Sequence, residues 1–267
     1  MELHEKSSAL VSVVMAAYND EAFIARAIES ILSQQYSNVE LIVIDDGSTD
    51  RTNEIIASFS DNRISLVTHS ENRRLASSLN EGVQLASGRY VARLDADDVC
   101  HPARLVRQVR YMERHPEVTV VGGDAIAFGS ARGRLRYPRR HEAIKARLLF
   151  QNAMSHPTVM FRKEAVPEWY DAGIVAGQDY ELWARLVWMV RFANLRIPAI
   201  SYRFHEGQSS KRLGRHQVST ARSARRVMAS TLADSWSGPD WDLYLQACEC
   251  VEALTLTELC AFEGLLR

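Results

Sequence analysis

The chain has 267 residues, of which 46% are hydrophobic and 24% are charged, the balance of a compact protein with a sizeable core. Its 32 basic and 33 acidic side chains give a net charge of −1. This balance excludes a uniformly basic protein, and we expect no nucleic-acid partner. No apolar run approaches the roughly 20 residues that cross a bilayer, and the first residues lack a secretory pattern. We therefore expect a cytoplasmic protein, with peripheral contact at the inner face of the membrane left open.

Residues 10–94 alternate short β-branched runs with helical stretches, a pattern typical of parallel strands joined by crossover helices. The predicted strands are Val11–Met15, Leu41–Ile44, Ile64–Val67 and Tyr90–Leu94. Between the first two, Ile24, Ile28 and Ile31 line one face of a helix that can pack on the sheet. The sequence therefore predicts an α/β fold with a Rossmann-like, mostly parallel central sheet flanked by helices.

The chain after residue 100 is less regular. Apolar positions at Leu105, Val109 and Met112 predict one helix, and residues 180–190 predict another. Short strands are predicted at Val118–Val121, Val159–Phe161 and Phe192–Leu195. A basic stretch, Arg203–Arg226, precedes an acidic one with apolar positions, Asp234–Glu263, and we interpret this end of the chain as a helical appendage.

Polar side chains follow three of the predicted strands. Ala17, Tyr18 and Asn19 come after the first, Asp46 after the second, and Asp95–Asp98 after the fourth. In an open α/β sheet, ligands bind outside the carboxyl ends of the strands. Tyr18 could stack on a base, and the Asp46 carboxylate could accept the imide hydrogen of a pyrimidine. Any one of these side chains alone would more often cap a helix or anchor a loop, but their joint placement favours a ligand site.

Asp95 and Asp97 stand two positions apart, so extended backbone aims both side chains toward the same side. Hard cations such as Mg²⁺ or Mn²⁺ take oxygen ligands, and a diphosphate can complete their shell. A solvated acidic turn is the alternative. However, three carboxylates in four positions repel one another unless a cation neutralises them. The sequence therefore favours a metal or another cationic ligand here.

Five segments together resemble one protein family. They are Val11–Glu21, Ser30–Gln35, Val43–Asp50, Leu79–Gly82 and Leu94–Asp98. This series is similar to the inverting, metal-dependent nucleotide-sugar glycosyltransferases of the GT-A fold (family 2 type), which build bacterial polysaccharides. The resemblance is continuous from Val11 to Val121 and patchy to Ser210. It implies a GT-A domain over residues 1–212, with a nucleotide-binding half at 10–100 and an acceptor half at 101–212, followed by the appendage at 213–267.

The resemblance also implies a role for each matching residue. Nucleotide binding falls to Ala17, Tyr18, Asn19, Asp46, Arg74 and Asp95. Asp97 and His205 would hold Mn²⁺ or Mg²⁺, and Asp179 would be the catalytic base. Gln178 replaces the acid that usually precedes this base, and Arg74 stands where many relatives have glycine. A bland alternative for Asp179 is the N-cap of the following helix.

The implied reaction moves a sugar from a nucleoside-diphosphate sugar, with uridine diphosphate expected, to a hydroxyl of a saccharide or lipid-linked saccharide. Two alternatives stay open. Asp95-Ala96-Asp97-Asp98-Val99 also fits the motif of haloacid-dehalogenase-like phosphohydrolases, although that motif normally follows the first strand. A nucleotide-sugar-binding protein with impaired catalysis is the other alternative, supported by Gln178. The basic helix around Arg215–Arg226 could contact anionic lipid headgroups or pack on the acidic tail.

Overall fold

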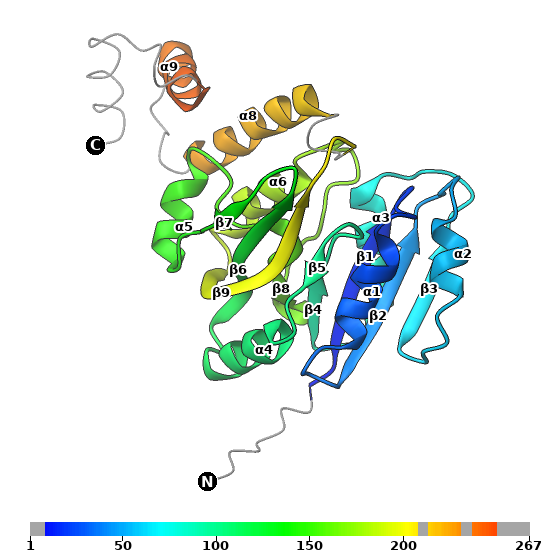
Figure 1. The fold of residues 1–267 in the computed structure, drawn as a ribbon. Helices are drawn as coiled ribbons and strands as arrows, with labels where there is room; N and C mark the ends of the chain where they lie inside the picture. The colour runs from blue at the N-terminus through cyan, green and yellow to red at the C-terminus, as the bar shows by residue number, and fades with distance from the viewer. Residues whose placement is uncertain (1–8, 208–212, 231–236, 250–267) are drawn as a thin grey trace.

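The computed structural model describes residues 9–207, 213–230 and 237–249 (Figure 1). The strands in this part of the chain are β1 Val11–Ala17, β2 Val39–Asp45, β3 Ile64–Thr68, β4 Tyr90–Arg93, β5 Val99–Cys100, β6 Val118–Gly129, β7 Gly133–Leu135, β8 Met160–Arg162 and β9 Arg191–Phe204. The helices are α1 Ile24–Leu32, α2 Thr52–Ala57, α3 Leu75–Leu85, α4 Arg104–Arg114, α5 His141–Leu148, α6 Gln178–Leu186, α8 Gly214–Ser230 and α9 Gly238–Glu249, with 3₁₀ turns η1 His156–Thr158 and η2 Lys163–Ala165.

Within the described ranges, the strands form one nine-stranded mixed sheet in the order β3-β2-β1-β4-β8-β6-β9-β5, with β7 paired to β6. The first four strands in this order run parallel, as the alternating pattern predicts. Strand β8 joins them to the second half by antiparallel pairing with both β4 and β6. Because β1, β2 and β4 are parallel neighbours, their carboxyl ends meet at one edge of the sheet.

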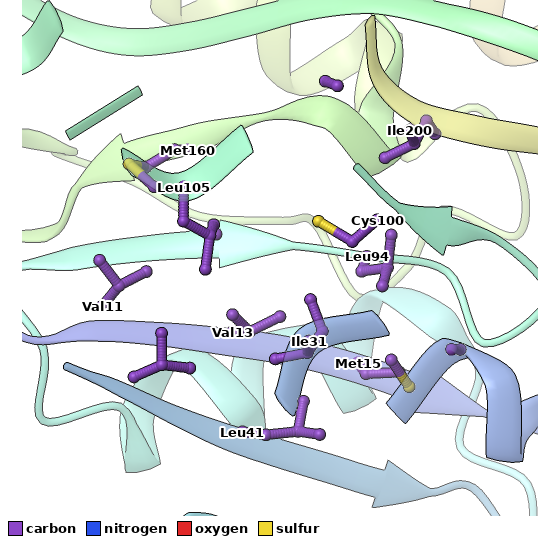
Figure 2. Packing of buried hydrophobic residues seen from close by; sticks show 14 of the residues in the cluster. Val11, Val13, Met15, Ile31, Leu41, Leu94, Cys100, Leu105, Met160 and Ile200 are labelled. Atoms are coloured by element: carbon purple, nitrogen blue, oxygen red, sulfur yellow. The ribbon is translucent and has the colours of Figure 1, made fainter. Parts of the chain in front are cut away.

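The core lies on both faces of this sheet. Val13 and Met15 point into one hydrophobic cluster with Ile31 and Leu105, whereas Val14 points into a second cluster with Trp183. Figure 2 shows Val13, Met15 and Ile31 in the first cluster. Side chains alternate along a strand, so a strand covered on both faces needs an unbroken apolar run. This explains why β1 contains no polar-apolar alternation.

Two strands of the second half are much longer than predicted. The prediction ends one strand at Val121, before two glycines, but β6 continues through Gly122 and Gly123 to Gly129. A Cβ atom on Gly123 would lie 2.9 Å from the Ala199 Cβ atom of β9. These glycines permit close approach of β6 and β9 instead of ending the strand. The second prediction, at Phe192–Leu195, likewise underestimates β9.

The first helix of the predicted appendage packs on the main body. Ala224 and Met228 of α8 belong to the same buried cluster as Trp183 of α6, and Arg225 Nε donates a hydrogen bond to the Phe150 carbonyl at 3.0 Å. Helix α8 thus shares the hydrophobic core of the main body. The domain boundary at residue 212 stays a prediction. None of the helices described has the length and apolar character that crossing a membrane requires.

Candidate active site

The loops that follow β1 and β2 are fastened to each other. Asn19 has a left-handed backbone (φ 57°), and its Oδ1 accepts the Thr49 backbone N–H at 2.8 Å. The Asn19 backbone N–H donates to Ser48 Oγ at 3.0 Å. Ala17 is buried and Tyr18 is 40% exposed beside this junction. The three residues predicted to bind the nucleotide base thus lie at this junction, where the Tyr18 ring is accessible.

Asp46, the predicted base-binding residue, is buried and fixed by two donors. Its Oδ1 accepts the Arg73 backbone N–H at 2.9 Å and lies 2.8 Å from His69 Nδ1. His69 Nε2 lies 2.8 Å from Glu81 Oε2. Burial disfavours the charged imidazole, but the hydrogen bonds to Asp46 and Glu81 outweigh it and raise the pKa of His69. No sequence motif points to His69, whose only signal is its position directly after β3.

An acidic cluster follows β4. Asp95, Asp97 and Asp98 each place a carboxylate oxygen within 4.8 Å of the others. Burial raises the pKa of Asp95 to about 6, opposed by the neighbouring Arg93 guanidinium and assisted by Asp97. Asp98 accepts the Arg203 backbone N–H at 2.8 Å through Oδ1, while its buried Oδ2 has no hydrogen-bond partner. Such a cluster of carboxylates suits a hard divalent cation.

His205 lies next to this cluster, although it is 108 positions from Asp97 in the sequence. It follows β9, and its Nε2 lies 3.0 Å from Asp97 Oδ2. The preceding strand is held in place by Arg203, whose Nε donates to the Asp97 carbonyl at 2.8 Å. The two predicted metal ligands are therefore adjacent. A carboxylate with a neighbouring imidazole is a donor set that Mn²⁺ accepts and that Mg²⁺ accepts less readily.

Asp20 is a fourth acid near the cluster, to which the sequence analysis gave no role. Burial raises its pKa to about 7, partly offset by the Tyr18 backbone N–H. The charges of Asp97 and Asp95 raise that pKa further. A neutral or cation-compensated state is thus favoured for Asp20, which fits the same electropositive ligand.

Asp179 lies in the first turn of α6. The N-cap of this helix is Gly177, in a left-handed conformation (φ 81°), so the predicted alternative of Asp179 as N-cap is wrong. Burial raises the pKa of Asp179, while the Tyr180 backbone N–H and the Asn152 side chain stabilise the charged form. Asn152 Nδ2 donates to Asp179 Oδ2 at 2.6 Å. A partly buried carboxylate with a raised pKa suits proton abstraction. No sequence motif points to Asn152.

Arg74 precedes α3 in a backbone conformation (φ 72°, ψ 156°) that is almost restricted to glycine. Its side chain is exposed, and no hydrogen bond or ion pair links that side chain to the acidic cluster within residues 9–207. The strain gives a physical reason for the glycine that many relatives are expected to have here. The nucleotide-binding role of Arg74 stays a prediction.

Comparison with known proteins identifies the family of the chain. Residues 12–168 match the family described as Glycosyl transferase family 2. The chain is 32% identical over 233 residues to an uncharacterized glycosyltransferase of Haemophilus influenzae, covering 81% of this chain and 72% of the relative. It is 31% identical over 202 residues to the Escherichia coli enzyme named UDP-Glc:alpha-D-GlcNAc-diphosphoundecaprenol beta-1,3-glucosyltransferase WfgD, covering 75% of this chain and 79% of the relative.

The fold matches solved structures as well. S. aureus TarS 1-349 in complex with UDP-GlcNAc has a TM-score of 0.68 at 16% identity, over 96% of this chain and 79% of that one. At this identity the likeness concerns the fold alone, and it confirms the predicted GT-A architecture. The sequence match, the fold and the cluster at the sheet edge agree: the chain belongs to glycosyl transferase family 2 and is a glycosyltransferase.

Proposed function

We propose that this glycosyltransferase moves a sugar from uridine-diphosphate sugar to a hydroxyl of a lipid-linked saccharide, with inversion, in polysaccharide synthesis. The proposal is carried by the placement of Asp46 and the acidic cluster after parallel strands of one sheet, with His205 next to the cluster. The name of the related WfgD enzyme supports the choice of donor and acceptor, since it specifies UDP-Glc and a diphosphoundecaprenol-linked sugar.

On the donor side, Tyr18 and Asp46 would contact the base, and Asp95 would approach the ribose. Asp97 and His205 would hold Mn²⁺ or Mg²⁺, which when bound offsets the negative charge that develops on the departing diphosphate. The carboxylates of Asp97 and Asp98 and the His205 imidazole supply a suitable set of ligands. Arg93 holds Asp95 by hydrogen bonds and keeps a positive charge beside the cluster.

On the acceptor side, Asp179 would take the proton from the attacking hydroxyl. Asn152 fixes the direction of the Asp179 carboxylate through its hydrogen bond. The charge of Asp179 also raises the pKa of Asp95, which supports an interaction between the proposed base and the acidic cluster. A single displacement at the anomeric carbon inverts its configuration and requires no covalent intermediate.

We also propose peripheral contact of α8 with an anionic membrane surface, where a lipid-linked acceptor would reside. Arg215, Arg222 and Arg226 are exposed at helical spacings of seven and four, and no acid occurs in the helix. Sedimentation with vesicles of anionic phospholipid at low and high salt tests this contact, because headgroup attraction is screened by salt. Binding that is absent at low salt would exclude it.

The function is tested with the full chain, Mn²⁺, a panel of uridine- and guanosine-diphosphate sugars, and a lipid-diphosphate saccharide as acceptor. We expect transfer from a uridine-diphosphate sugar, with the product of inverted anomeric configuration. Hydrolysis of generic phosphomonoesters is measured as a control, because a haloacid-dehalogenase-like phosphohydrolase would catalyse it. Neither this alternative nor the nucleotide-sugar-binding protein has support from the comparisons. Rapid hydrolysis without sugar transfer, or nucleotide binding without transfer to any acceptor, would overturn the proposal.

A further inference from the structure

His69 lies between two carboxylates in the interior of the nucleotide-binding half. It follows β3, and only 2% of its side chain is exposed. One ring nitrogen, Nδ1, lies 2.8 Å from Asp46 Oδ1, and the other, Nε2, lies 2.8 Å from Glu81 Oε2 on α3. The imidazole therefore connects the end of β2 to the helix that covers it.

Both contacts of His69 are hydrogen bonds only if the ring carries a proton on each nitrogen. A neutral imidazole has one N–H, so its second nitrogen would present a lone pair to a carboxylate oxygen. The charged groups around the ring are Asp46, Glu81 and the Arg73 guanidinium, which lies 3.9 Å from Glu81. Two acids against one arginine favour the imidazolium.

The imidazolium restricts what Asp46 can bind. Oδ1 of Asp46 accepts from both His69 and the Arg73 backbone N–H, whereas within the described part of the chain Oδ2 makes no hydrogen bond. Asp46 can thus offer one oxygen to a base. Uracil presents a single imide N–H between two carbonyl groups, but guanine presents two adjacent N–H donors that pair best with both oxygens of a carboxylate.

We propose that His69, bridged to Glu81, is a positioning residue that holds Asp46 as a single acceptor and thereby selects uracil over guanine. This inference rests on the proposed function, because it assumes that Asp46 reads the base. It adds a pH dependence. Since the pKa of His69 is raised above its usual value of about 6.5, uracil recognition is intact at acidic pH and is lost as pH rises through that raised pKa.

The test measures the dissociation constants of uridine diphosphate and guanosine diphosphate by calorimetry at fixed Mn²⁺, from about pH 6 to about pH 9. The variants are His69→Gln, Glu81→Gln and the matched control His115→Gln, an exposed histidine that pairs with Glu117. The terminal phosphate of the nucleotide titrates in the same way with wild type and with every variant. The difference in dissociation constant between wild type and a variant therefore reports the effect of the substituted residue. Thermal unfolding at each pH confirms that each variant is folded.

We expect His69→Gln to bind uridine diphosphate about tenfold more weakly at acidic pH and to lose the decline at alkaline pH. Glu81→Gln should bind like wild type at acidic pH but decline at a lower pH, which a purely structural role would not cause. His115→Gln should match wild type. If both His69→Gln and Glu81→Gln bind uridine diphosphate as wild type does at every pH, the inference is overturned while the proposed function stands. Tighter binding of guanosine diphosphate than of uridine diphosphate by wild type would overturn both the inference and the proposed uridine-diphosphate donor. Absence of nucleotide binding in wild type would overturn the proposed function.

Discussion

Residues 10–100, predicted to bind the nucleotide, and residues 101–212, predicted to bind the acceptor, position their candidate functional groups by different means. In residues 10–100, the predicted residues other than Arg74 stand within a few positions of a strand end, as Asp46 does after β2. In residues 101–212, Asp179 is oriented by Asn152, 27 positions away. Beyond β9, His205 meets Asp97 across 108 positions. Local groups are visible as motifs, whereas groups assembled by long-range contacts are visible only singly.

The sharpest separation of the two halves comes from Asp179→Asn. We expect kcat to fall about 10²- to 10⁴-fold, because loss of a general base removes that much, while the affinity for uridine diphosphate stays unchanged. Steady-state kinetics and calorimetry measure the two effects. Asp171→Asn is the control, since this acid is exposed and its side chain accepts the Gly173 backbone N–H at 2.8 Å. Full activity of Asp179→Asn would remove Asp179 from its role.

Asp97→Asn tests the place where the halves meet. We expect Mn²⁺ to bind about 100-fold more weakly, since even outer-shell partners of a metal site are worth about 10- to 100-fold. Titration of Mn²⁺ followed by electron paramagnetic resonance measures this. His205→Asn should weaken Mn²⁺ by a smaller factor. Asp61→Asn, at the opposite end of β3 and paired with Arg63, should leave Mn²⁺ affinity as in wild type. Wild-type affinity in both site variants would place the metal elsewhere.

Asn152→Ala tests whether the acceptor half tunes its own base. Asp179 works only when ionised and its pKa is already raised by burial, so activity is lost as pH falls through that pKa. Removing the Asn152 hydrogen bond, which stabilises the charged form, should raise that pKa further and move the acid limb of kcat to higher pH. Asn53→Ala, which loses the bond to Asp45 at 2.8 Å in the other half, should not move this limb. A fixed limb in Asn152→Ala would show that Asn152 does not act through Asp179.

Arg74→Gly has the smallest expected effect and concerns the nucleotide-binding half alone. Glycine relieves the backbone conformation at φ 72°, so we expect the free energy of unfolding to rise by about 1 kcal/mol. Affinity for uridine diphosphate should fall at the same time if Arg74 contacts the nucleotide. Urea unfolding and calorimetry measure the two quantities. Arg51→Gly, at φ −83° before α2, should gain no stability. A stabilised variant with unchanged affinity would leave Arg74 as a solvated charge.

The elements of the first half follow closely from the sequence. The strands predicted at Val11–Met15 and Leu41–Ile44 lie inside β1 and β2, because a short, mostly apolar run has few other places in a fold whose sheet is covered on both faces. The predicted strand ends are less accurate where glycine could either end a strand or allow close packing within it. Gly122 and Gly123 resembled a strand end, yet they serve close packing of β6 against β9, which no local pattern reveals.

Sequence alone determined which chemical groups stand at the strand ends, since strand periodicity and strand order place Asp46 and Asp95–Asp98 at one edge. It did not determine how those groups are charged or held. His69 has no motif of its own, and its protonation depends on Asp46 and Glu81 approaching its two nitrogens. The same holds for Asp179, whose basicity depends on burial and on Asn152. Charge and orientation depend on burial and on short distances between residues far apart in the chain, and only the tertiary structure sets these.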